Sequence, residues 1–217
     1  MSRRVRICFV GDSITAGTGD DRFLGWPGRL AVHEHAGGND VTVYNLGIRA
    51  DTSEHLAARW QVECRARLPA HVNGALVFAF GVNDAALERG KGLRVPIERS
   101  AAIAQSMLDA AKTWLPTLWV GPAPVAAEGA TISPGPDIAY EFANDRIAAL
   151  NGAYAKLAGR IGVPYLDVFA ALEATPAWQP AVAAGDGVHP TAEGYLLIAE
   201  IVRAWPAWRA WWDSGPA

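Results

Sequence analysis

Residues 5–13 read Val-Arg-Ile-Cys-Phe-Val-Gly-Asp-Ser, and this stretch decides the fold. The run at 5–10 is short and mostly apolar, and a glycine closes it. Such a run is typical of a central strand in a parallel sheet that is covered on both faces. The polar residues Asp12 and Ser13 follow directly, so we expect them at the rim of the sheet, beyond the end of that strand.

Further apolar runs of strand length alternate with longer helical patterns along the chain. The strands are predicted at 41–45, 75–80, 117–120 and 164–168. One helix starts with Ser53 as its N-cap and stops at Pro69, and the others are predicted at 97–114, 138–161 and 192–205. This alternation, with short connections, indicates a three-layer α/β fold with a mostly parallel five-stranded sheet.

Length and composition favour one globular domain over residues 1–217. The chain is 51% hydrophobic and 19% charged, which is enough to bury a sizeable core and excludes disorder of the bulk. Residues 122–136 fit neither period, because they hold four prolines, two glycines and a single charged residue, Glu128. We predict a loop there. Since long loops at strand ends are often functional, the segment at about 122–145 is a candidate lid.

Charge and cysteine content argue against several function classes. Nineteen Lys and Arg against twenty-two Asp and Glu give a net charge of −3, with no basic stripe for a nucleic acid. Cys8 and Cys64 lie in a strand pattern and a helical pattern, which suits buried thiols, and neither has zinc-like spacing. Arg6 and Asp12 interrupt the first apolar stretch, and no run approaches the ~20 apolar residues of a membrane span. We therefore expect a cytoplasmic protein with no metal and no stable membrane insertion.

Ser13 is the candidate nucleophile. A serine just past a strand end is exposed at the sheet rim, where N–H groups of the next turn can bind an anion. A phosphate-binding turn and a helix cap are the alternatives. The spacing of Gly11, Gly17 and Gly19 fits neither the dinucleotide-binding pattern nor the P-loop, and no lysine follows.

A serine hydroxyl needs a base to take its proton, and His189 is the candidate base. It lies in Asp186-Gly187-Val188-His189-Pro190, where a carboxylate at i can reach Nδ1 of a histidine at i+3 and leave Nε2 free for the serine. The alternative is that Asp186 caps the turn and His189 precedes the start of a helix. The other four histidines lie in surface-like patterns: His33, His35, His55 and His71.

Two further turns can supply donors for a developing oxyanion. Asn83, in Gly81-Val82-Asn83-Asp84, follows the run at 75–80 and offers a side-chain amide. Gly47, in Asn45-Leu46-Gly47, follows the run at 41–45 and offers a backbone N–H. Each alone is a turn motif. Together with the serine and the Asp-x-x-His pair, they are expected to share one edge of the sheet.

These four blocks resemble those of the SGNH hydrolases of the GDSL esterase/lipase superfamily, in the family's order and over nearly the whole chain. The resemblance implies a flavodoxin-like α/β/α sandwich and a catalytic triad of Ser13, Asp186 and His189. It further implies an oxyanion hole formed by the Ser13 N–H, the Gly47 N–H and the Asn83 side chain, with no cofactor. The chain departs from the pattern at Ile14, where leucine is commonest, and at 49–53, where the family often has another glycine.

The resemblance implies hydrolysis of carboxylic esters through an acyl-enzyme on Ser13, with short- to medium-chain acyl groups on a small-molecule or lipid ester. An acyltransferase or a thioesterase/lysophospholipase of the same fold is an alternative, and so is a non-catalytic ligand-binding module. Trp26-Pro27 resembles the bacterial esterase, thioesterase and lysophospholipase branch, although a core tryptophan at a helix start explains it equally well. Candidate substrate contacts are Asp12, Trp26 and Val188. The alternative role for Asp12 is to hold the loop beside Ser13 by hydrogen bonds. Apolar residues of the lid region complete the candidate acyl pocket: Ile132, Tyr140 and Phe142.

The C-terminal segment is rich in tryptophan. A homo-oligomer or lipid contact is one interpretation of its spacing. Burial against the body of the protein is the other. The four residues are Trp205, Trp208, Trp211 and Trp212.

Overall fold

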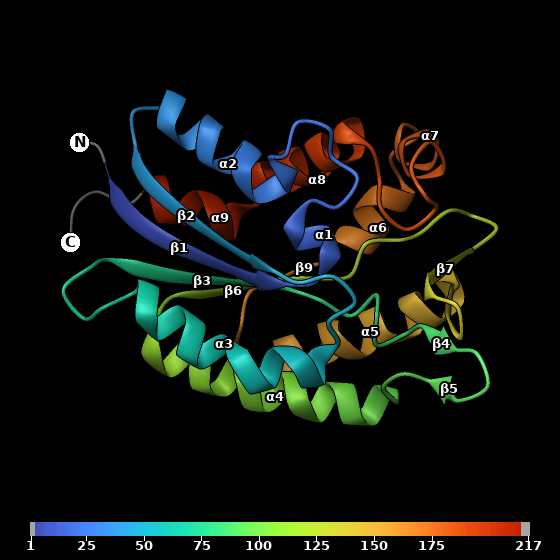
Figure 1. Cartoon of the computed structure of the whole chain (residues 1–217). Coiled ribbons are helices and arrows are strands. Elements are labelled where there is room, and N and C mark those ends of the chain that lie inside the picture. The colour runs from blue at the N-terminus through green and yellow to red at the C-terminus, as the bar shows by residue number, and fades with distance from the viewer. Residues whose placement is uncertain (1–2, 214–217) are drawn as a thin grey trace.

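The structure is a computed structural model that describes residues 3–213, and its centre is a five-stranded parallel sheet (Figure 1). The strand order is β2-β1-β3-β6-β9, with every neighbouring pair parallel. This is the flavodoxin-like order, so the fold predicted from the sequence is confirmed. The strands are β1 (Arg4–Gly11), β2 (Asp40–Gly47), β3 (Gly74–Ala79), β6 (Thr117–Val120) and β9 (Tyr165–Leu166).

Helices cover both faces of this sheet (Figure 1). One face carries α3 (Ser53–Arg67), α4 (Ile97–Trp114) and α5 (Asn144–Ile161), and the other carries α2 (Gly25–Ala36), α8 (Ala192–Ala204) and α9 (Pro206–Asp213). Strand β1 alternates between the two cores: Cys8 and Val10 pack on the first side, and Ile7 and Phe9 on the second. A strand buried on both faces explains the mostly apolar run from which the fold was predicted. Three short helices complete the fold: α1 (Ser13–Ala16), α6 (Val168–Glu173) and α7 (Trp178–Ala183).

A second, four-stranded antiparallel sheet was not predicted. Its order is β5-β4-β8-β7. It lies at the end of the molecule towards which β1 and β3 point (Figure 1). The strands are β4 (Leu87–Glu88), β5 (Gly92–Leu93), β7 (Ala130–Gly135) and β8 (Ile138–Phe142).

This small sheet corrects two predictions. The segment 122–136 is not a loop throughout, because its second half forms β7. The helix predicted at 138–161 begins only at Asn144, because residues 138–142 pair with β7 and β4.

The N-cap of α3 is Thr52 rather than the predicted Ser53. A reciprocal capping box joins Thr52 and His55.

Buried and exposed positions agree with most of the smaller predictions. Cys8 and Cys64 are buried free thiols. The histidines at 33, 35, 55 and 71 are exposed. In the C-terminal segment, Trp208 is buried against Phe9, with ring centroids 6.2 Å apart, and its Nε1 donates to Glu34 at 3.0 Å. Burial therefore accounts for Trp208, and the oligomer contact stays a prediction.

Candidate active site

The segment joining β1 to α1 places Ser13 at the carboxyl edge of the large sheet. Gly11 allows this, because a Cβ there would lie 2.1 Å from Thr15 Oγ1 and 2.3 Å from the carbonyl oxygen of Ala79. Asp12 caps α1 by accepting from the Ile14 N–H at 2.9 Å. Ser13 is thus the first helical residue, so its N–H has no partner within the helix.

Ser13, His189 and Asp186 form a continuous hydrogen-bonded chain. His189 Nε2 lies 2.7 Å from Ser13 Oγ, and His189 Nδ1 lies 2.7 Å from Asp186 Oδ2. Asp186 Oδ1 also accepts the backbone N–H groups of Val188 at 3.0 Å and of His189 at 2.7 Å. The structure therefore brings the three predicted triad residues together, although 176 positions separate the serine from the histidine.

The environment keeps Asp186 ionised. Partial burial opposes the charge, but the hydrogen bonds from the side chain and backbone of His189 outweigh it and lower the pKa of Asp186 to about 2. A carboxylate in this position fixes the ring so that Nδ1 carries the proton and Nε2 faces the serine. Ser13 and His189 are 5% and 6% exposed, so the pair is shielded but reachable from one side.

A pocket of about 420 Å³ opens in front of the serine, a volume suited to a small ligand. One wall is apolar and comes from β7 and β8. Val188 lines the pocket, as the sequence analysis predicted. Arg49 also lines it, and this exposed side chain makes no ion pair or hydrogen bond with the residues that the structure describes. The lining residues are Ser13, Arg49, Ala50, Val82, Asn83, Ile132, Pro134, Tyr140, Phe142, Val188 and His189.

Asn83 is placed in the pocket as expected. Its Oδ1 accepts a hydrogen bond from Arg94 at 3.1 Å. This bond leaves the amide nitrogen available on the pocket side, next to the serine and the histidine. Asn83 is 5% exposed, so its amide is held in a largely buried setting.

Gly47 is not placed in the pocket, which corrects the prediction for the second oxyanion donor. Its N–H donates to the side chain of Asn45 at 3.0 Å. A Cβ on Gly47 would lie 2.2 Å from the Ala16 nitrogen, so the glycine is required for close packing against α1. Ala50 lines the pocket instead, with a left-handed backbone at φ 64°. Its N–H donates to no group among residues 3–213.

The loop that carries Asn83 is anchored by its neighbour Asp84, a residue to which the sequence analysis gave no role. Asp84 is fully buried and accepts from the Ser53 N–H at 2.9 Å, from the Ser53 hydroxyl, and from the Ser100 hydroxyl at 2.6 Å. Burial raises its pKa, and these hydrogen bonds oppose the shift. The partners lie far away in the chain, so no local pattern indicated them.

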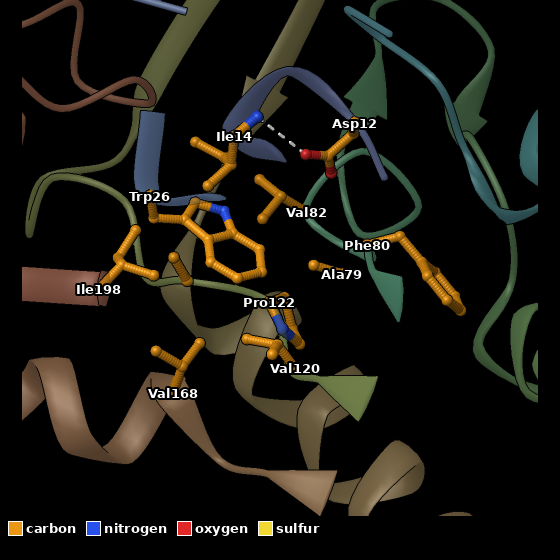
Figure 2. A pocket seen from close by; sticks show the side chains of 12 residues that line it. Asp12, Ile14, Trp26, Ala79, Phe80, Val82, Val120, Pro122, Val168 and Ile198 are labelled. Carbon is orange, nitrogen blue, oxygen red and sulfur yellow. Dashed lines mark hydrogen bonds between the residues drawn. The ribbon is translucent and has the colours of Figure 1, made fainter. Parts of the chain in front are cut away.

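Asp12 and Trp26 lie outside the pocket of Ser13, which corrects their prediction as substrate contacts. Both line a separate cavity of about 20 Å³, which Ile14 also lines and which has room for about one water molecule (Figure 2). Trp26 is 1% exposed and packs edge-on against Phe9, with centroids 5.1 Å apart. Core packing therefore explains Trp26, and loop capping explains Asp12.

A metal site or a membrane span would be a further functional feature of the described part of the chain. No group of three or more His, Cys, Asp or Glu residues there could hold a metal ion. No helix there is long and apolar enough to cross a membrane.

Comparison with known proteins adds a family and a set of similar folds. The model of the GDSL-like Lipase/Acylhydrolase family matches residues 9–197. No curated protein matches the chain. A lipase/acylhydrolase from Enterococcus faecalis is 22% identical, with a TM-score of 0.72 over 93% of each chain. An acetylxylan esterase from Geobacillus stearothermophilus is 20% identical, with a TM-score of 0.73 over 95% of this chain and 97% of that one. At these low identities, the likeness of this chain to the two structures shows a shared fold alone.

Proposed function

Because this chain belongs to the GDSL-like lipase/acylhydrolase family, we propose that it is a serine esterase that cleaves carboxylic esters through an acyl-enzyme on Ser13. The observation that carries the proposal is the chain of hydrogen bonds from Ser13 through His189 to Asp186. A nucleophile, a base and a group that orients the base are the parts that acyl transfer requires.

In the first half of the reaction, Ser13 Oγ attacks the ester carbonyl carbon while its proton passes to His189 Nε2. Asp186 stabilises the resulting imidazolium. The C–O bond to the alcohol then breaks, and the alcohol leaves with the proton held by His189. In the second half, water gives its proton to His189 and attacks the acyl-enzyme. The acid is released and the proton returns to Ser13.

The negative charge on the tetrahedral intermediates needs donors aimed at it. We assign this role to the Asn83 amide nitrogen, the Ser13 N–H and the Ala50 N–H. Ala50 takes the place that the sequence analysis gave to Gly47, since it lines the pocket with Ser13 and its N–H is uncommitted within residues 3–213.

The pocket favours short- to medium-chain acyl groups on a small ester. Its apolar wall, with Ile132, Tyr140 and Phe142, suits a hydrocarbon chain, and Val188 adds to it beside the base. Arg49 is the pocket's unpaired cation among the described residues. It would contact a carboxylate or another anionic group on the substrate.

The test is the initial rate on p-nitrophenyl esters from acetate to palmitate, for the wild type and for Ser13→Ala. Ser133→Ala is the matched control, because Ser133 is an exposed serine of β7 outside the pocket lining. We expect Ser13→Ala to lose turnover, Ser133→Ala to keep it, and the rate to peak at a short or medium chain. Wild-type rates in Ser13→Ala would overturn the proposal, and the protein would then be considered as a ligand-binding module.

A further inference from the structure

Arg94 directly follows β5 and is held there by the backbone of the neighbouring loop. Its N–H donates to the carbonyl oxygen of Ala86 at 3.0 Å, and the next N–H, of Val95, donates to Asp84 at 3.2 Å. The guanidinium is half-buried and makes no ion pair within the described residues. Its side-chain hydrogen bonds therefore go to neutral acceptors, and its charge also opposes the raised pKa of the buried Asp84.

Those acceptors lie in two loops, and each of these loops also supplies one of the proposed oxyanion donors, Asn83 or Ala50. Arg94 Nη1 donates to Asn83 Oδ1 at 3.1 Å, and Nη2 donates to the carbonyl oxygen of Ala50 at 2.7 Å. The planar fork of an arginine can make two such bonds at a fixed angle, which a lysine cannot. One side chain thus spans the loops that follow β2 and β3.

The bond to Asn83 decides which end of the amide faces the pocket. With Oδ1 held by a cation, the amide nitrogen points to the other side, where a developing oxyanion needs a donor. Without Arg94, a rotation of the amide by about 180° would place its oxygen against the oxyanion and turn attraction into repulsion.

The bond to Ala50 holds a strained backbone. A left-handed conformation is unfavourable for a residue with a Cβ, and such strain persists only where the surroundings fix it. A charge-assisted hydrogen bond to the Ala50 carbonyl oxygen is a suitable restraint on this residue, whose own N–H has no acceptor among residues 3–213.

The same guanidinium contacts the small antiparallel sheet. Its central carbon lies 4.2 Å from the ring centroid of Tyr140 in β8, within the range of a cation–π interaction. Tyr140 lines the pocket. The apolar wall and the oxyanion donors are therefore connected through one side chain.

Given the proposed esterase function, on which this inference rests, we propose that Arg94 is a positioning residue that orients the Asn83 amide and the Ala50 peptide for the oxyanion and connects both to the substrate wall at Tyr140. It touches neither the substrate nor the reacting atoms. Its effect therefore appears in the transition state and passes through Asn83 and Ala50.

The test is a double-mutant cycle on p-nitrophenyl acetate with Arg94→Gln, Asn83→Ala and the double variant. Since misplacing a catalytic group by about 1 Å can cost 10²-fold, we expect Arg94→Gln to lower kcat roughly 10- to 100-fold with KM changed less than about threefold. In the Asn83→Ala background the same change should cost clearly less, because only the hold of Arg94 on Ala50 then remains. Inhibition by phenylboronic acid, which binds serine as a tetrahedral adduct, should weaken by the same factor as kcat/KM.

Arg89→Gln is the matched control. Arg89 belongs to the same hairpin and is exposed, and it pairs with Glu141 at 3.0 Å instead of with the pocket. It should keep wild-type kinetics. Arg94→Lys retains the charge over Tyr140 but not the two-armed fork, so we expect it to fold and to recover only part of kcat. If Arg94→Gln does not fold, the kcat of Arg94→Lys tests the positioning role of Arg94 in its place.

The outcomes separate this inference from the proposed function. Loss of turnover in Ser13→Ala together with unchanged kcat in Arg94→Lys and Arg94→Gln overturns the role of Arg94 alone. The role of Arg94 is also overturned if Arg94→Gln lowers kcat by the same factor in the wild type and in the Asn83→Ala background. Wild-type turnover in Ser13→Ala overturns the esterase and, with it, the oxyanion hole that Arg94 is proposed to position.

Discussion

Replacing Asp12 by asparagine should flatten the dependence of stability on pH. Burial raises the pKa of Asp12 from 3.8 to about 7, against the hydrogen bond from the Ile14 N–H, and Oδ2 has no partner among the described residues (Figure 2). The folded state therefore binds the proton more tightly than the unfolded state, so ionisation destabilises the fold. This cost is absent below pH 3.8, grows as the pH rises towards 7, and is complete above it.

The magnitude follows from the two pKa values. At about 1.36 kcal/mol per pKa unit, the cost is about 1.5 kcal/mol at pH 5 and about 4 kcal/mol at pH 8. The asparagine side chain of the variant is neutral at every pH and still offers its Oδ1 to the Ile14 N–H. The difference in unfolding free energy between wild type and Asp12→Asn should therefore shift by about 2.5 kcal/mol in favour of the variant from pH 5 to pH 8.

Urea unfolding at the two pH values measures this difference, since titrating groups that do not interact with Asp12 cancel between the two proteins. Asp137→Asn, at an exposed position, is the matched control and should follow the wild type. Parallel pH dependences for wild type and Asp12→Asn would refute the reasoning, because they would mean that Asp12 is ionised in the fold at no cost.

Two further predictions concern the loop at 49–50. Arg49→Gln should lower kcat/KM for p-nitrophenyl hemisuccinate, which carries a carboxylate, by about tenfold, corresponding to about 1.4 kcal/mol, and leave p-nitrophenyl acetate within about twofold. An equal loss on both esters would show that Arg49 does not contact an anionic group of the substrate. Ala50→Gly removes the Cβ from a left-handed position and should raise the unfolding free energy by up to about 1 kcal/mol with kcat kept within about threefold. A lower urea midpoint in this variant would contradict the strain assigned to Ala50.

The triad and the large sheet were predictable because their signals are local. The central strands β1 and β3 are mostly apolar runs, and Asp186 and His189 lie three residues apart in one turn. Parallel strands bring the turns that follow them to one edge, so the meeting of Ser13 with Asn83 followed from the fold class.

The second oxyanion donor and the small sheet were not predictable in this way. Which N–H faces the pocket depends on turn conformation, and a glycine at 47 was the more obvious choice than an alanine at φ 64°. The strand β7 contains Pro134, and β8 resembles a helix start because polar residues interrupt its apolar pattern. Arg94 escaped notice because its acceptors, Asn83 and Ala50, lie in two other loops.

The distance of 176 residues between the nucleophile and its base has a consequence for biosynthesis. During translation the strand before Ser13 is made well before the Asp186–His189 turn. The two helices that follow this turn, α8 and α9, pack on the same face of the sheet as α2. A growing chain therefore carries the proposed nucleophile without its proposed base until the residues between them have been made. On the proposed function, esterase chemistry is thus withheld from the nascent protein until the Asp186–His189 turn has reached Ser13.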